Sequence, residues 1–224
     1  MLTLWVKSLS LIPRLLFAKG DTMKNPVKVA VLVSGGGTNL QAIIDFAKEG
    51  GLGSGEIVKV ISSKEGAYAL LRAEKAGICG VTVKRKGKTQ QEFEKELISE
   101  LDNCGAEIIV LAGFMCILSK DFTDRYKNRI INVHPSLIPS FCGEGYYGLK
   151  VHEAALSYGV KVTGATVHFV NEVPDGGEII MQKAVSVEQD DTPEVLQKRV
   201  MEQAEWIILP ASLELVCKNL RKGD

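Results

Sequence analysis

Asn132 and His134 stand two residues apart in the string Asn-Val-His-Pro, which follows the strand-like run 129–131. On a β-strand, residues with this spacing point to the same face. An amide donates a neutral hydrogen bond and a protonated imidazole donates a charged one. Together they can stabilise a carbonyl oxygen that becomes negative during a reaction. The alternative is a structural histidine at a capped strand end, and the motif alone does not decide between the two.

A carboxylate that could act on this histidine lies in the turn 174–177, Pro-Asp-Gly-Gly. If Asp175 docks against the imidazole of His134, its charge is expected to raise the His134 pKa above the reference value of about 6.5. The histidine would then serve as an acid near neutral pH. Asn132, His134 and Asp175 are therefore our candidates for the chemistry.

A glycine-rich loop, Ser-Gly-Gly-Gly-Thr-Asn, occupies positions 34–39 between a predicted strand and a predicted helix. Glycines let the backbone approach a ligand, and a helix N-terminus supplies free N–H groups. The loop lacks the Gly-Lys-Ser/Thr of ATP-binding loops, and Leu40 stands where the dinucleotide pattern needs a glycine. A small monophosphate therefore fits Gly37, Thr38 and Asn39 better than ATP or NAD does. The alternative is a tight turn capped by Thr38 or Asn39.

A second loop, 112–119, is apolar and follows the predicted buried strand 108–111. An apolar slot with inward-pointing main-chain groups suits a flat heteroaromatic ligand. Taken alone, however, its composition favours core over a ligand pocket. Ser119 is expected to cap the helix that follows.

The elements that must position these loops alternate between strand and helix from residue 27 onward. Continuous apolar runs predict strands covered on both faces, and apolar spacings of three and four predict helices between them. The order predicts an α/β fold with a doubly wound, mostly parallel sheet, an antiparallel C-terminal strand pair and a long closing helix. The strands are expected at 27–33, 57–62, 81–83, 108–111, 130–133, 160–170 and 178–187, and the helices at 39–48, 67–76, 90–101 and 192–220.

In such sheets, ligands bind beyond the carboxyl ends of the strands. The loops 34–39 and 112–119 and the string 132–135 all follow strands. We therefore expect them to meet at one edge of the sheet.

Length and composition set further limits. A chain of 224 residues fits one largish domain, and its 27 Lys+Arg balance its 27 Asp+Glu, so no overall field favours nucleic acid or an anionic membrane. No apolar run reaches the roughly 18 residues of a membrane span. The cysteines are odd in number and lack metal spacing, which predicts a reducing, cytoplasmic location and no structural zinc. They are Cys79, Cys104, Cys116, Cys142 and Cys217.

Residues 1–22 differ from the rest of the chain, with no acidic residue among the first 20 and an apolar run, 9–17, that a proline and an arginine interrupt. A signal peptide needs an uninterrupted apolar core, and an organelle transit peptide is the alternative. Since residues 24–26 lead from Met23 straight into the first strand, we expect Met23 to be the effective start, residues 1–22 to be a non-functional extension and 23–224 to form the domain.

Four separated segments resemble the phosphoribosylglycinamide formyltransferases, the folate-dependent enzymes of purine synthesis. They are 34–43, 111–119, 131–139, and 164–170 with 175–177. The resemblance runs from about residue 27 to the closing helix and implies a Rossmann-like formyltransferase fold. It also implies formyl transfer from 10-formyltetrahydrofolate to the amine of glycinamide ribonucleotide. The resemblance implies no metal, nucleic acid or membrane as a partner, and it leaves open whether the protein forms a homodimer.

The resemblance assigns roles to individual positions of this chain. Asn132, His134 and Asp175 match the catalytic trio of the family. Gly37, Thr38 and Asn39 match its loop for the substrate phosphate, and Glu205 matches a position that contacts the ribose. The segment that lines the folate site, largely through its backbone, corresponds to Met115, Cys116, Ile117 and Leu118.

Three positions depart from the family pattern. Cys116 stands where many members have arginine, and Ser140 lies where a lysine is found. Gln90 aligns with a basic residue that helps to hold the donor, and Lys88 lies nearby. These departures bear on donor binding and leave the trio intact.

Related functions share part of these motifs. Formyltetrahydrofolate deformylase carries an N-terminal regulatory domain, for which residues 1–22 leave too little room. Methionyl-tRNA formyltransferase carries an additional RNA-binding domain after its core. An inactive nucleotide-phosphate binder would not need the trio of Asn132, His134 and Asp175, so we expect an active formyltransferase.

Overall fold

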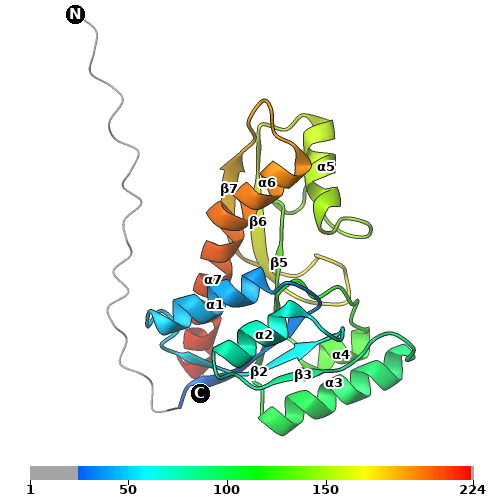
Figure 1. Ribbon diagram of the computed structural model, residues 1–224, viewed down its shortest axis with the longest axis vertical. Helices are drawn as coiled ribbons and strands as arrows, with labels where there is room; N and C mark the ends of the chain where they lie inside the picture. Colours follow the sequence, from blue (N-terminus) through cyan, green and yellow to red (C-terminus); the bar gives the residue numbers. More distant parts are fainter. Residues whose placement is uncertain (1–24, 223–224) are drawn as a thin grey trace, which may run out of the picture.

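The structure, a computed structural model, describes residues 25–222, so the extension expected at residues 1–22 lies outside the described residues. Seven strands form one sheet in the order β3-β2-β1-β4-β5-β6-β7 (Figure 1). The pairs from β3 to β5 are parallel and the C-terminal β6–β7 pair is antiparallel, as predicted. The β5–β6 pair is antiparallel as well. The strands are β1 (Val27–Val33), β2 (Gly55–Ser62), β3 (Gly80–Thr82), β4 (Ile108–Leu111), β5 (Ile130–His134), β6 (Val162–Phe169) and β7 (Ile179–Ser186).

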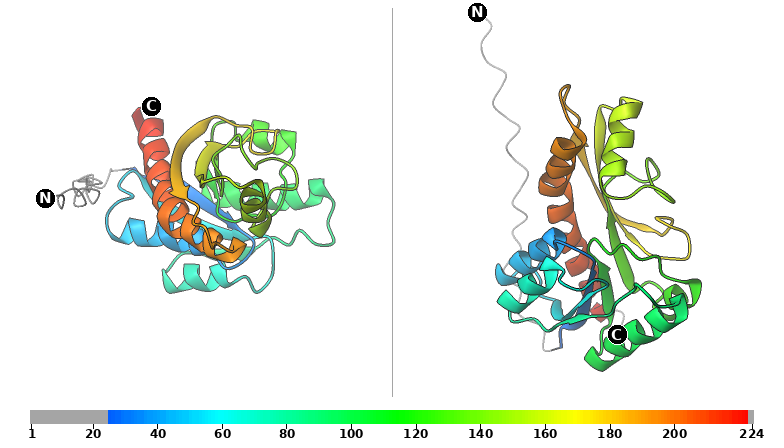
Figure 2. Two further views of the ribbon diagram at one scale, coloured as in Figure 1. Left: turned by 90° about the horizontal axis from the view of Figure 1, so that it is seen from above. Right: turned by 45° about the vertical axis from the view of Figure 1, so that its right-hand side comes forward.

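Helices cover both faces of this sheet (Figure 2). One face packs against α1, α2, α6 and α7, and the other packs against α3 and α4. The helices are α1 (Thr38–Lys48), α2 (Tyr68–Lys75), α3 (Gln90–Cys104), α4 (Lys120–Arg125), α5 (Leu149–Tyr158), α6 (Pro193–Val200), the π-helical turn η1 (Met201–Glu205) and α7 (Trp206–Lys222).

The two-sided covering explains why β1 is a continuous apolar run. Val29 and Val31 belong to the core cluster that contains α1 and α7, whereas Ala30 and Leu32 belong to the cluster that contains α3. All four side chains are fully buried. A strand that buries both faces gains from apolar residues at every position, which is why it lacks the alternation of a half-exposed strand.

Two helical features differ from the sequence-based expectation. Helix α5 was not predicted, because its buried residues are Val151, His152 and Ala155, which form no large apolar stripe. The expected single helix at 192–220 is interrupted by η1, and Pro210 follows within α7. Proline has no N–H to donate within a helix, and π turns occur mostly as single widened turns inside α-helices, so neither feature leaves a signal in the apolar spacing.

The close approach of β6 and β7 predicts a stability effect at Gly164. A Cβ at this position would lie 2.1 Å from the Lys183 carbonyl oxygen and 2.9 Å from Leu137 Cδ2. The backbone of β7 cannot move away from this methyl group without separating the two strands. Gly164→Ala should therefore lower the free energy of unfolding by about 2 kcal/mol or more. Urea denaturation measures this. Gly35→Ala adds its methyl to open space and should stay within about 0.5 kcal/mol of the native protein. Similar losses in both variants would contradict this packing.

Candidate active site

The three loops singled out from the sequence meet at the carboxyl ends of β1, β4 and β5. Leu32 pairs with Leu111 across β1 and β4, and Leu111 pairs with Asn132 across β4 and β5. A hydrogen bond joins the first two loops directly, since the Met115 N–H donates to Ser34 Oγ at 2.9 Å. The expected clustering at one edge of the sheet is therefore confirmed.

Asn132 and His134 lie on β5, and β6 runs antiparallel beside them with His168 opposite Asn132. The Asn132 Nδ2 and His168 Nε2 atoms are 3.2 Å apart. His168 Nδ1 lies 2.8 Å from the Phe169 carbonyl oxygen, so this nitrogen carries the proton of a neutral ring. His168 Nε2 is then free to accept a hydrogen bond from the Asn132 amide.

Asp175 reaches the same place from the loop after β6. Its Oδ2 lies 3.4 Å from His134 Nδ1, and its Oδ1 lies 3.5 Å from His168 Nε2. Asp175 adopts a left-handed φ of 55°, which aspartate tolerates better than most residues. After Asp175 the chain passes close to Phe169, and only glycine fits at position 177, because a Cβ there would lie 1.7 Å from the Phe169 carbonyl oxygen. The docking of Asp175 on His134 occurs as the sequence predicts.

The expected rise of the His134 pKa is wrong for this structure. Burial is the largest influence and lowers the pKa of His134, which is 4% exposed. The charge of Asp175 and the Phe141 carbonyl oppose the shift without reversing it. For Asp175, burial works toward a higher pKa, but the neighbouring His168, His134 and Gly143 N–H hold its pKa below the usual range. The structure thus favours a neutral imidazole beside an ionised carboxylate.

A backbone contact that the sequence did not reveal engages the other nitrogen of His134. The Phe141 carbonyl oxygen lies 2.8 Å from His134 Nε2. Phe141 has a left-handed φ of 49°, and the Gly143 N–H donates to Asp175 Oδ2 at 2.9 Å. The segment 141–143 therefore lies against His134 and Asp175, and both ring nitrogens of His134 face oxygen atoms.

The glycine loop begins α1 without a side-chain cap. Gly37 is the residue before the first turn and has a φ of 71°. A Cβ at Gly37 would lie 2.6 Å from Ala69 Cβ, so both the backbone conformation and the packing require glycine. Neither Thr38 nor Asn39 caps the helix, which rules out the capped-turn alternative. No side-chain cap therefore satisfies the first-turn N–H groups of α1, which also lack partners within the helix.

Asn39 instead points to Glu205, at the end of η1. Its Nδ2 donates to Glu205 Oε2 at 2.7 Å, and both side chains are buried. Burial raises the pKa of Glu205 to about 7, against the opposing influence of the Asn39 hydrogen bond. This contact brings a residue from the C-terminal helices to the edge of the glycine loop.

The apolar loop after β4 is divided between core and surface. Leu118 is buried in the cluster around α3, whereas Met115 and Ile117 are 54% and 77% exposed. Cys116 is half-buried. The core interpretation is therefore right for Leu118 and wrong for Met115 and Ile117, whose side chains are open to a ligand.

Helix α3 holds this loop in place. Gln90 Nε2 donates to the Ile117 carbonyl oxygen at 2.9 Å. Glu94 accepts hydrogen bonds of 2.6 Å from both the N–H and the hydroxyl of Ser119. Ser119 Oγ also accepts from the Phe122 N–H and caps α4, as predicted. Sequence reasoning missed Glu94, for which a buried acidic residue inside an amphipathic helix was the available signal.

His152 is a second buried group that the sequence left as structural or surface. Its ring is fully buried, neither nitrogen has a hydrogen-bond partner, and burial lowers its pKa to about 4. It therefore stays neutral at physiological pH.

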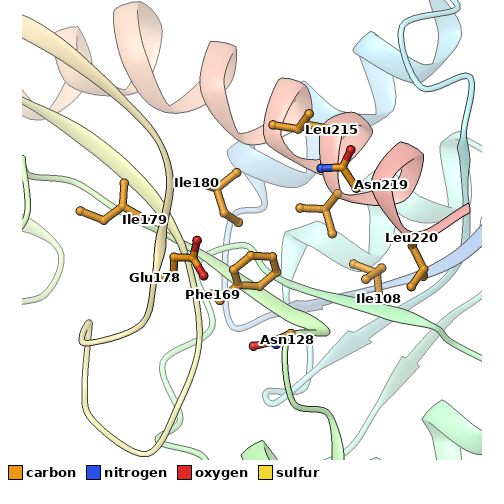
Figure 3. Close-up of a pocket in the computed structure, with 10 residues that line it drawn as sticks. Ile108, Asn128, Phe169, Glu178, Ile179, Ile180, Leu215, Asn219 and Leu220 are labelled. Atoms are coloured by element: carbon orange, nitrogen blue, oxygen red, sulfur yellow. The ribbon is translucent and has the colours of Figure 1, made fainter. Parts of the chain in front are cut away.

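A cavity of about 330 Å³ lies elsewhere, between β7 and the C-terminal half of α7 (Figure 3). Figure 3 shows mostly apolar side chains around it, with Glu178 as its ionisable lining residue. None of the candidate site residues lines this cavity. Its lining is Ile108, Asn128, Phe169, Glu178, Ile179, Ile180, Leu215, Val216, Asn219 and Leu220.

Three findings concern residues 25–222 as a whole. No group of three or more His, Cys, Asp or Glu side chains there is arranged to hold a metal ion. In the same range, no helix has the length and apolar character needed to cross a membrane. All five cysteines are free thiols.

Comparison with known proteins gives relatives along most of the chain. The sequence model of the formyl transferase family matches residues 27–212. The phosphoribosylglycinamide formyltransferase of Haemophilus influenzae is 41% identical over 197 residues, which cover 88% of this chain and 88% of that protein. The trifunctional purine biosynthetic protein adenosine-3 of Gallus gallus is 45% identical over 90% of this chain. This chain spans 19% of the length of that trifunctional relative.

A solved structure agrees with these sequence matches. Glycinamide ribonucleotide transformylase 1 from Symbiobacterium toebii has a TM-score of 0.81 and is 37% identical, and the match covers 88% of this chain and 90% of that one. The predicted fold and the resemblance noted from four short segments are both confirmed. The chain belongs to the formyl transferase family, within which it groups with the phosphoribosylglycinamide formyltransferases.

Proposed function

We propose that this chain transfers the formyl group of 10-formyltetrahydrofolate to the primary amine of glycinamide ribonucleotide in purine biosynthesis. One observation carries the proposal. Asn132, His134 and Asp175 meet at the sheet edge where the glycine loop after β1 and the exposed apolar segment 115–117 after β4 also lie. Two ligand sites beside one set of polar groups suit direct transfer between two bound molecules, which gains most from proximity.

The acceptor is assigned to the glycine loop. Gly37, Thr38 and Asn39 supply backbone N–H groups at the N-terminus of α1, a favourable place for a phosphate. Glu205 is assigned to the ribose hydroxyls, an assignment that its hydrogen bond with Asn39 at the edge of the glycine loop supports. Its raised pKa means that the carboxyl changes charge close to neutral pH.

The folate donor is assigned to the loop after β4. Met115 and Ile117 offer exposed apolar surface for a flat ring, while Cys116 and Leu118 contribute main-chain groups. Gln90, which stands where the family pattern has a basic residue, has a structural role in this chain. Its Nε2 donates to the Ile117 carbonyl oxygen, and its Oε1 accepts from Arg85 at 3.2 Å. Gln90 thus supports the donor loop where a basic residue would contact the donor directly.

The folate supplies a formyl group bonded to its N10. Asn132 donates a hydrogen bond to the formyl oxygen as it gains negative charge during addition of the amine, and His134 adds a charged donor once it holds the proton that the amine loses. Neutral His134 accepts the proton that the amine loses, and Asp175 stabilises the resulting imidazolium. His134 then returns this proton to N10 as the bond between N10 and the formyl carbon breaks, so the transfer consumes no net proton. The Phe141 carbonyl must leave His134 Nε2 before this nitrogen can reach the reactants.

The remaining assignments follow from the same proposal. The enzyme acts on small molecules in the cytoplasm, which the free thiols and balanced charge support. Its residues perform the transfer without a metal or a nucleic-acid partner, and residues 1–22 take no part in it.

An acceptor assay tests the function. Purified protein with 10-formyltetrahydrofolate is offered glycinamide ribonucleotide, methionyl-tRNA or water alone. We expect formylated ribonucleotide and tetrahydrofolate in equal amounts with the first acceptor only. Release of formate without an acceptor would identify a hydrolase, and ribonucleotide binding without turnover would identify an inactive binder.

The coupling of His134 to Asp175 predicts a steep loss of turnover in Asp175→Asn. Asparagine also tolerates the left-handed φ at this position, so the loop should keep its shape. An amide cannot stabilise imidazolium, so the His134 pKa should fall further and kcat should drop by about 10²–10³. Substrate affinity should be kept.

His134→Ala is the companion variant for this prediction. It should cost at least as much turnover as Asp175→Asn, and the double variant should be little worse than the more severe single one. NMR titration of His134 with and without the carboxylate gives the pKa directly. An unchanged pKa would mean that Asp175 acts in some other way.

The buried Glu205 predicts a pH dependence of stability. Burial raises its pKa from the ordinary 4.5 to about 7. Between these values the folded protein holds a proton that the unfolded chain releases, so its stability falls as the pH rises through this window and stays lower above it. In Glu205→Gln this loss is absent, so the variant should gain about 1 kcal/mol or more on the native protein between about pH 5 and pH 8. Urea denaturation across this range measures the difference, and parallel curves would show that Glu205 does not titrate there.

A further inference from the structure

Arg72 of α2 lies outside every motif noted in the sequence, yet its guanidinium contacts the glycine loop. Arg72 Nε donates to the Gly36 carbonyl oxygen at 2.8 Å, and Nη1 donates to Gln41 Oε1 at 2.9 Å. We propose that Arg72 is a positioning residue for the acceptor phosphate. It holds the Gly36 peptide in the orientation that binds an anion and places a positive charge beside the loop. This inference rests on the proposed acceptor site.

The first step is the orientation of the loop peptides. The Ala69 N–H donates to the Gly35 carbonyl oxygen at 3.1 Å, so α2 binds the carbonyls of both Gly35 and Gly36. In a trans peptide the N–H points opposite to the carbonyl. The N–H groups of Gly36 and Gly37 therefore point away from α2. Successive N–H groups turned to one side form a concave anion site.

The second step is the fit between α2 and the loop. A Cβ at Gly37 would lie 2.6 Å from Ala69 Cβ and 3.5 Å from Arg72 Cδ, so the loop packs directly on this part of the helix. Arg72 cannot move away without loosening the same contact. The arginine is thus part of the support of the loop and not a free surface cation.

The third step is charge. The loop 34–39 contains no lysine or arginine, whereas a phosphate monoester carries between one and two negative charges at neutral pH. Arg72 is half-buried, and its guanidinium lies over the Tyr68 ring at 5.0 Å from the ring centre. A guanidinium fixed in this way loses little further freedom when an anion binds and is screened less than an exposed one.

A purely structural role makes a different prediction. If Arg72 only ties α2 to α1, its loss should affect every acceptor ligand equally, with or without a phosphate. If it positions the phosphate, its loss should affect only the phosphorylated ligand. Two ligands that differ by the phosphate alone therefore separate the two roles.

The experiment measures the binding of glycinamide ribonucleotide and of its dephosphorylated riboside by calorimetry. Arg72→Gln should weaken ribonucleotide binding by about tenfold or more and riboside binding by less than about twofold. Arg72→Lys keeps the charge but loses the planar donor geometry, so its ribonucleotide affinity should lie between those of Arg72→Gln and the native protein. Inorganic phosphate should compete with the ribonucleotide in the native protein and much less in Arg72→Gln.

Lys75→Gln is the matched control, since it removes the same charge from an exposed position on α2. It should leave both affinities unchanged. Equal weakening of both ligands by Arg72→Gln, or weakening of neither, would overturn the proposal. If Arg72→Gln does not fold, Arg72→Lys decides by the same comparison of ligands. A native protein that binds neither ligand would contradict the acceptor site itself, which is a separate outcome.

Discussion

The Asp175 carboxylate joins three segments that lie far apart in the sequence, and the geometry of the site depends on it. It contacts His134 on β5, His168 on β6 and the Gly143 N–H in the loop before α5. A carboxylate removed from water is stable only with such partners, because burial of an unpaired charge costs several kcal/mol. Because each partner belongs to a different segment, the carboxylate fixes how these segments meet.

The two imidazoles beside this carboxylate have different hydrogen-bond partners, which separate their tasks. His168 donates to its neighbouring backbone carbonyl and accepts from Asn132, so it orients the Asn132 amide. His134 is held by Asp175 on one side and by the Phe141 carbonyl on the other. The contacts of His168 are thus structural, and the proton transfer that we propose falls to His134, after the Phe141 carbonyl leaves its Nε2.

Much of the fold could be predicted because its signals are local. The apolar runs of β1 and β4, the cap at Ser119 and the strand spacing of Asn132 and His134 each follow from neighbouring residues. Other features depend on tertiary contacts, which a sequence pattern does not contain. The lowered His134 pKa reflects burial by distant segments, and the Phe141 contact uses a backbone atom that every residue has. Helix α5 was missed because its buried face, formed by Val151, His152 and Ala155, makes no large apolar stripe.

The π-helical turn η1, between α6 and α7, affects which faces of these two helices are buried. Buried residues recur every four positions here, at Leu196, Val200, Ala204 and Ile208. A regular helix would drift by about 40° at each such step, and the wider turn takes up this drift. Twelve residues separate Leu196 from Ile208 and complete three turns, whereas a regular helix completes three turns in about 11. The segment η1 therefore holds one residue more than regular winding needs, and its widened turn ends at Glu205, whose carboxyl meets Asn39. Loss of one residue from η1 would restore a regular helix and leave α6 and α7 in phase, so the pairing of Glu205 with Asn39, and not the packing of the two helices, depends on the extra residue.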